Sequence, residues 1–76
     1  MSLVLGVNGQ DGSYLAESLL KRGRRVVGVG RQEASRYVPS SENFSYIQLD
    51  IANTKGLVLL LNKLSPDKIF HVAAIH

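Results

Sequence analysis

Three glycines, Gly6, Gly9 and Gly12, mark the junction between an apolar run (residues 3–7) and a segment with helical periodicity. In a strand-to-helix turn with this G-x-x-G-x-x-G spacing, the first glycine allows the tight bend, the second lets a ligand approach the backbone, and the third lets the helix pack close to the strand. Because the amides at a helix start lack partners and carry partial positive charge, the loop is suited to bind a pyrophosphate. The alternative is a glycine-rich turn that holds no ligand. The loop residues predicted to bind are Gly6, Asn8, Gly9, Gln10, Asp11 and Gly12.

A basic side chain, Arg31, follows a second apolar run (residues 25–29) and lies 19 positions after Gly12. In folds that bind dinucleotides at such a loop, an acidic residue here binds the ribose 2′-hydroxyl of NAD, whereas an arginine accommodates the 2′-phosphate of NADP. Arg31 therefore predicts NADP rather than NAD, with Arg36 as a second candidate, because a guanidinium can pair two phosphate oxygens. The alternative is a solvated arginine on a loop.

Asp50 ends a third apolar run, at the edge of the sheet where ligands bind in such folds. Its carboxylate could accept a hydrogen bond from an adenine amino group. An equally weighted alternative is an ordinary turn-forming aspartate that leads into the next helix.

The two histidines do not predict catalysis or metal binding. His71 lies inside an apolar run between Phe70 and Val72, so we expect a packed or hydrogen-bonded side chain. His76 ends the sequence and has no setting from which to argue a role. Neither stands at a metal-ligand spacing from other ligating residues, so no metal site is predicted.

The positions of these residues depend on four strands that alternate with two helices. Short β-branched runs predict strands at residues 3–7, 25–29, 44–49 and 68–73, and apolar stripes predict helices at 13–22 and 54–64, the second capped by Asn53. This alternation predicts an α/β fold: a partial, doubly wound parallel sheet of the Rossmann type, with right-handed crossovers and strand order 3-2-1-4. The helices then lie on opposite faces of the sheet.

The composition narrows the class of protein. The chain has 76 residues, 45% of them hydrophobic, and no cysteine, which excludes a disulfide framework and a thiolate metal site. The net charge is +3, but basic residues at the end of the first predicted helix complement its dipole, so we expect no nucleic-acid partner. The longest apolar run, residues 57–61, is too short to span a membrane, and no signal peptide is recognisable. A cytoplasmic location is the expectation.

The glycine loop resembles a known superfamily. Residues 6–17, Gly-Val-Asn-Gly-Gln-Asp-Gly-Ser-Tyr-Leu-Ala-Glu, are similar to the opening of the extended short-chain dehydrogenases/reductases. The string Gln-Asp-Gly-Ser-Tyr at 10–14 resembles, more specifically, the GDP-mannose 4,6-dehydratase family. Residues 49–53 and 65–74 are similar to the third-strand ending and the fourth strand of the same superfamily. The sequence departs from the family pattern at Leu5, Gln32 and Ile75, where threonine, arginine and glutamine are usual.

The resemblance implies a parent enzyme: an NADP-dependent lyase that converts GDP-mannose to GDP-4-keto-6-deoxymannose and forms a homo-oligomer. A related nucleotide-sugar reductase or epimerase, or a nucleotide-binding module without catalysis, are the alternatives. NADP would lie along the glycine loop and against a set of residues after the later strands: Arg31, Asp50, Ile51, Val72, Ala73 and Ala74.

No catalytic residue is predicted within the chain. The superfamily uses a Ser/Thr and a Tyr-x-x-x-Lys well beyond the fourth strand, and none of Tyr14, Tyr37 and Tyr46 has a lysine four positions on. We therefore expect residues 1–76 to be the N-terminal part of an NAD(P)-binding domain, inactive alone, without the catalytic and substrate-binding parts.

Overall fold

Runs of branched apolar residues form the centre of a four-stranded parallel sheet, in the order β3-β2-β1-β4. The computed structural model describes residues 1–72. Its elements in chain order are β1 (Ser2–Leu5), α1 (Gln10–Lys21), β2 (Val26–Gly30), β3 (Phe44–Gln48), α2 (Thr54–Leu64) and β4 (Lys68–His71). The predicted fold class and strand order are confirmed.

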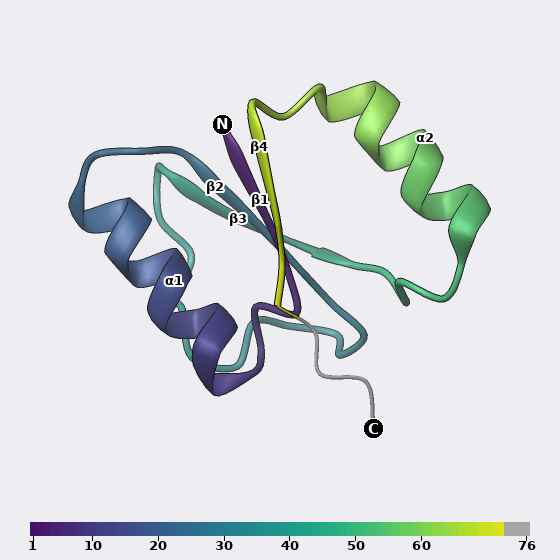
Figure 1. Cartoon of the computed structure of the whole chain (residues 1–76). Coiled ribbons are helices and arrows are strands. Elements are labelled where there is room, and N and C mark those ends of the chain that lie inside the picture. The colour runs from purple at the N-terminus through teal and green to yellow at the C-terminus, as the bar shows by residue number, and fades with distance from the viewer. Residues whose placement is uncertain (73–76) are drawn as a thin grey trace.

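Two apolar clusters hold a helix against each face of the sheet, and Figure 1 shows α1 and α2 on opposite sides. Alternate residues of β1 point to opposite faces, so Val4 joins the cluster of α1 while Leu3 and Leu5 join the cluster of α2. On the α1 side, Ala16 and Leu19 are buried against the sheet.

Helix α1 begins at Gln10, three residues before the predicted start, and ends at Lys21. Its first turn contains Gly12, a residue of low helix propensity, so the predicted start fell too late in the chain. The C-cap is Arg22, whose side chain is exposed. Gly23 follows with φ of 77°, the left-handed conformation that ends helices.

Helix α2 has the predicted bounds. The Asn53 side chain accepts a hydrogen bond from the Gly56 amide at 3.1 Å, which makes it the predicted N-cap. The predicted core stripe packs on the sheet, although no residue of α2 is fully buried. The stripe consists of Leu57, Leu60, Leu61 and Leu64.

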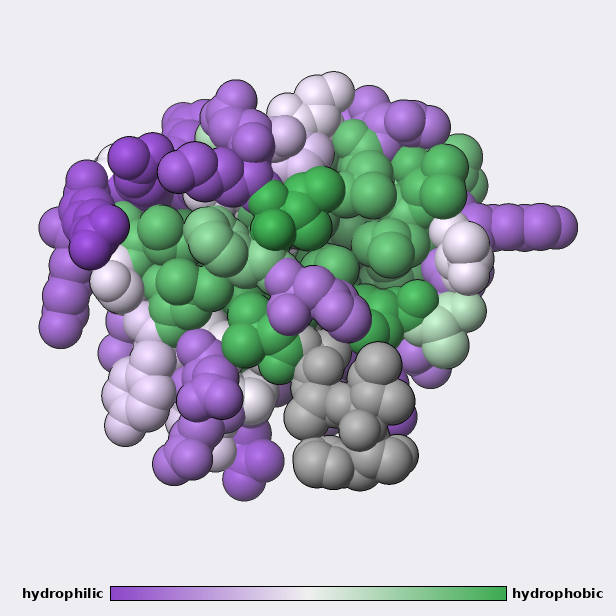
Figure 2. Space-filling model, in the orientation of Figure 1, coloured by the Kyte–Doolittle hydropathy of each residue, from purple (hydrophilic) through white to green (hydrophobic). Residues whose placement is uncertain are grey.

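Strand β4 is an outer strand, and its side chains are largely exposed. Ile69 is 50% exposed and the His71 side chain is exposed, so the expectation of a packed His71 is wrong. Among the described residues, β4 pairs only with β1. Helix α2 packs on the inner strands β1 and β2 and leaves the side chains of β4 largely uncovered. Figure 2 shows a broad apolar area on this face of the molecule.

Residues 31–43 connect β2 to β3 without a helical turn and carry one bridge, between Ser41 and Phe44. Within residues 1–72, neither helix has the length and apolar character needed to cross a membrane.

Candidate functional site

The glycine loop leaves β1 through a bend that requires its first glycine. Gly6 has φ of 90°, and both Gly6 and Val7 donate their amides to the Val29 carbonyl, at 2.9 and 3.2 Å. The Gly9 amide then donates to the Gly6 carbonyl at 3.1 Å, which closes the turn. A left-handed φ at this point favours glycine because a Cβ would be strained there.

The third glycine brings α1 onto the loop. A Cβ on Gly12 would lie 2.1 Å from the Gly6 carbonyl oxygen and 3.0 Å from the Val7 Cα, so only glycine allows this contact. The predicted reason for Gly12, close packing of helix on strand, is thus confirmed in the geometry.

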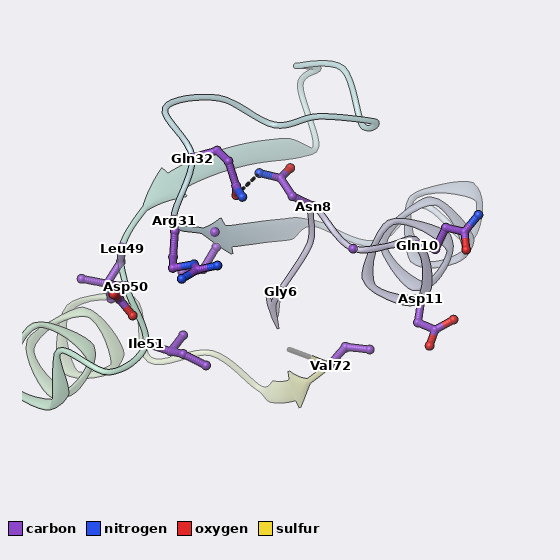
Figure 3. Close-up of a pocket in the computed structure, with 13 residues that line it drawn as sticks. Gly6, Asn8, Gln10, Asp11, Arg31, Gln32, Leu49, Asp50, Ile51 and Val72 are labelled. Atoms are coloured by element: carbon purple, nitrogen blue, oxygen red, sulfur yellow. Dashed lines mark hydrogen bonds between the residues drawn. The ribbon is translucent and has the colours of Figure 1, made fainter. Parts of the chain in front are cut away.

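The start of α1 is open for a ligand. Gly9 is the N-cap, and no side chain among residues 1–72 caps the first turn. Figure 3 shows the side chains of Gln10 and Asp11 directed away from the strand ends. Unpaired amides with partial positive charge at a helix start attract an anion.

A pocket of about 780 Å³ lies where the strands end beside this loop (Figure 3). Its volume is in the range of small-molecule sites. The lining residues come from the glycine loop and from the ends of β2, β3 and β4: Gly6, Asn8, Gly9, Gln10, Asp11, Val29, Gly30, Arg31, Gln32, Leu49, Asp50, Ile51 and Val72.

The structure therefore brings together most of the residues singled out in the sequence. Gly12 packs behind the loop and does not line the pocket, whereas Ala73 and Ala74 lie outside the described residues. Four further lining residues were not predicted. Each lies within two positions of Arg31 or Asp50 in the chain, and this proximity could have indicated them. They are Val29, Gly30, Gln32 and Leu49.

Arg31 follows β2, and its side chain extends into the pocket (Figure 3). Its carbonyl accepts a hydrogen bond from the Gln48 side chain at 3.0 Å, which ties the backbone of Arg31 to β3 while the side chain stays exposed. Arg36, the second candidate, is not among the lining residues. Its guanidinium carbon lies 5.2 Å from the centroid of the Tyr37 ring, a cation–π distance.

Asp50 forms the turn that was considered for it and also lies at the pocket. One carboxylate oxygen accepts a hydrogen bond from the Ala52 amide at 3.0 Å, and its carbonyl accepts one from the Asn53 amide at 2.8 Å. It thus forms the turn into α2 while it lines the pocket. Contact with adenine stays a prediction.

Asn8 does more than line the pocket, because its side chain is bonded to the segment after β2. Its amide nitrogen donates to the Gln32 side chain at 2.8 Å, to the Ala34 carbonyl at 3.2 Å and to the Tyr46 hydroxyl at 3.2 Å. Its amide oxygen accepts from the Arg36 backbone at 2.6 Å. We call these five residues the Asn8 network.

Tyr46 was not indicated by the sequence, since its partner Asn8 lies 38 positions away. The Tyr46 hydroxyl donates to the Gln32 carbonyl at 2.7 Å. Burial raises the pKa of this phenol, and the hydrogen bond from Asn8 opposes the shift.

A family model described as GDP-mannose 4,6 dehydratase matches residues 3–76, nearly the whole chain. The chain belongs to this family. One member, GDP-mannose 4,6 dehydratase 2 of Caenorhabditis elegans, is 33% identical over 87 residues. The match covers 97% of this chain and 23% of that relative, so the chain spans about a quarter of the length of the curated relative.

Solved structures agree with the family fold. The enzyme WbmH of Bordetella bronchiseptica, in complex with NAD⁺, superposes with a TM-score of 0.85 at 32% identity, covering 99% of this chain and 26% of that one. A short-chain dehydrogenase of Leptospira borgpetersenii with bound NAD⁺ gives a TM-score of 0.80 at 34% identity, covering 97% and 31%. The family's dehydrogenase-like Rossmann fold is thus present in this chain.

Proposed function

We propose that the chain is the NADP-binding, N-terminal part of a nucleotide-sugar dehydratase that acts on GDP-mannose. The observation that carries the proposal is the convergence of the glycine loop, the open start of α1, Arg31 and Asp50 on one pocket. Two solved relatives that hold NAD⁺ support a nicotinamide dinucleotide as the ligand.

Each part of such a dinucleotide has candidate binding residues in the chain. The loop amides between Gly9 and Gly12 would hold the pyrophosphate, because Gly9, which lines the pocket, has no Cβ to cover the backbone. Arg31 would pair with the 2′-phosphate. Asp50 and Ile51 would border the adenine, and Val72 would line the path toward the nicotinamide, with Ala73 and Ala74 as further candidates.

The reaction of the whole protein is part of the same proposal. When bound, the nicotinamide supplies a hydride acceptor and donor, which a sugar dehydratase needs to oxidise and then reduce its substrate. The residues of this chain bind and orient the cofactor. The sugar nucleotide, the general acid and base and the contacts of a homo-oligomer are assigned to the rest of the parent enzyme.

A related epimerase is the second candidate. An epimerase of Methanothermobacter thermautotrophicus superposes with a TM-score of 0.79 at 32% identity, covering 97% of this chain and 22% of that one. Both candidates need the same kind of cofactor site, and the family match over residues 3–76 favours the dehydratase.

Calorimetric titration of the 76-residue chain with NADP and with NAD tests the proposal. We expect NADP to bind more tightly than NAD. Arg31→Ala should weaken NADP binding about tenfold to a hundredfold while NAD binding changes little, since a hydrogen bond to a charged group contributes about 1.5–3 kcal/mol. Arg25→Ala, at the opposite end of β2, is the matched control. Equal affinity for the two dinucleotides would remove the NADP assignment, and no binding of either would remove the site.

A further inference from the structure

The Asn8 network joins two segments that a dinucleotide would contact at different places. Asn8 belongs to the glycine loop, beside the proposed pyrophosphate position, whereas Gln32, Ala34 and Arg36 belong to the segment after β2. Figure 3 shows the hydrogen bond from the Asn8 nitrogen to Gln32. Because the Asn8 oxygen also accepts from the Arg36 backbone, the side chain serves the protein rather than the ligand.

Tyr46 supports the network from β3. Its hydroxyl accepts from Asn8 and donates to the Gln32 carbonyl, so one phenol holds both segments at once. The loss of either contact would leave a polar group without its partner, which costs more than the hydrogen bond itself contributes.

Gly30 makes room for this arrangement. A Cβ on Gly30 would lie 2.7 Å from the Tyr46 hydroxyl and 3.1 Å from the Asn8 amide nitrogen. The end of β2 therefore passes directly beneath the network, one residue before Arg31.

Arg31 is held through its neighbours rather than through its own side chain. Gln32 is bonded at its side chain by Asn8 and at its carbonyl by Tyr46, and the Arg31 carbonyl is bonded by Gln48. The backbone of Arg31 and Gln32 is thus tied to β3, and the Gln32 side chain is tied to the glycine loop through Asn8.

We propose that Asn8 and Tyr46 are positioning residues that set the affinity and selectivity for a dinucleotide bearing a 2′-phosphate. This inference rests on the proposed function. A dinucleotide presents its pyrophosphate and its 2′-phosphate at a fixed separation. A rigid link between the glycine loop and the Arg31 segment lets the protein bind both phosphate groups at once. Because the segment is already ordered, binding does not have to supply the entropic cost of ordering it.

The variants Tyr46→Phe and Asn8→Ala test the inference, with Tyr14→Phe and Asn62→Ala as matched controls on exposed helical positions. Calorimetry measures the dissociation constants for NADP and NAD. Hydrogen exchange measures protection of the Arg36 amide, the donor to Asn8. The Tyr46→Phe change removes only the hydroxyl, so the sheet is retained even if Asn8→Ala loosens the glycine loop.

We expect Tyr46→Phe to weaken NADP binding about fivefold to tenfold, since each net hydrogen bond contributes about 1 kcal/mol. NAD binding should change less than NADP binding, and the Arg36 amide should exchange faster. The double variant should lose less than the product of the single losses, because the two side chains act as one unit. The control variants should leave all three readouts unchanged.

The outcomes separate this inference from the proposed function. If the wild-type chain binds NADP but both variants keep the wild-type ratio of NADP to NAD affinity, the inference is overturned and the proposed function stands. Unchanged exchange of the Arg36 amide in Tyr46→Phe and Asn8→Ala would also overturn it. A wild-type chain that bound neither dinucleotide would overturn the proposed function, and the inference with it.

Discussion

Replacement of Gly12 by alanine tests the central contact of the glycine loop. The added methyl would meet the carbonyl oxygen and carbon of Gly6 at 2.1 and 2.8 Å. Both are backbone atoms, which cannot rotate away as a flexible side chain would. Since carbon and oxygen atoms pack at about 3.5 Å, the start of α1 must retreat from the loop by about 1 Å or more.

The free-energy cost follows from two opposing effects. Overpacking of this kind costs about 1–3 kcal/mol, and so hard a contact belongs at the upper end. Alanine in place of glycine gains up to about 1 kcal/mol of helix propensity. We therefore expect Gly12→Ala to lose about 2 kcal/mol of unfolding free energy, a large share of the stability of a short chain. The same displacement moves the amides that would hold a pyrophosphate.

Urea unfolding and calorimetry with NADP measure the two effects, with Gly9→Ala as the matched control. With a urea dependence of about 1 kcal/mol per molar, the unfolding midpoint of Gly12→Ala should fall by about 2 M. A Cβ on Gly9 would lie 3.5 Å from the Gly6 oxygen, an ordinary contact, and its φ of −80° suits any residue. Gly9→Ala should therefore keep its midpoint and lose NADP binding, because the methyl points into the ligand space.

The reasoning would be refuted by a Gly12→Ala chain with the wild-type midpoint and wild-type affinity for NADP. A Gly9→Ala chain that unfolds as early as Gly12→Ala would contradict the distinction between packing and ligand access.

Three further predictions concern the caps and ionisable groups. Asn53→Ala should lower the unfolding free energy by about 1 kcal/mol in urea, because the Gly56 amide loses its cap. The pKa of Tyr46 is raised in the folded chain, so the stability linked to this phenol is present below the unfolded pKa of about 10 and is lost as pH rises. Ultraviolet titration should show one phenol that ionises at higher pH in the native chain than in urea, and Tyr46→Phe should abolish this difference. The hydrogen bond from the Met1 ammonium, and then its positive charge, lower the pKa of Asp67. The stability from this pair is therefore present above the unfolded pKa of about 3.9 and is lost as pH falls. Carboxyl chemical shifts should report the lowered pKa, and Asp67→Asn should reduce the loss of unfolding free energy at acid pH.

Local signals made much of the fold predictable. The β-branched runs placed all four strands, and helix α2 was predicted to the residue because Asn53 caps it and Ser65-Pro66 ends it. The start of α1 was placed late because its first turn contains Gly12, whose value lies in a tertiary contact rather than in helix propensity.

Site residues that come directly after strands could be predicted from the sequence. Site residues that depend on hydrogen bonds to residues far away in the sequence could not. Arg31 and Asp50 could be placed because the carboxyl ends of parallel strands meet at one edge. The pairing of Asn8 with Tyr46 leaves no periodic signal, and the spacing of the two residues in the sequence does not indicate it. The exposure of His71 depends on what flanks an outer strand, which the apolar residues around it do not specify.

The strand order has a consequence for how the chain folds. All four residues of β1 are buried, yet one of its two neighbours, β4, begins 66 positions after Ser2. At a synthesis rate of about 5–20 residues per second, β4 is completed about 2–8 s after β2. Until then, one edge of this buried strand has no partner, and the long loop between β1 and β4 makes their pairing costly in conformational entropy. The slowest folding step should therefore be the docking of β4, and a nascent chain is most prone to aggregate just before it.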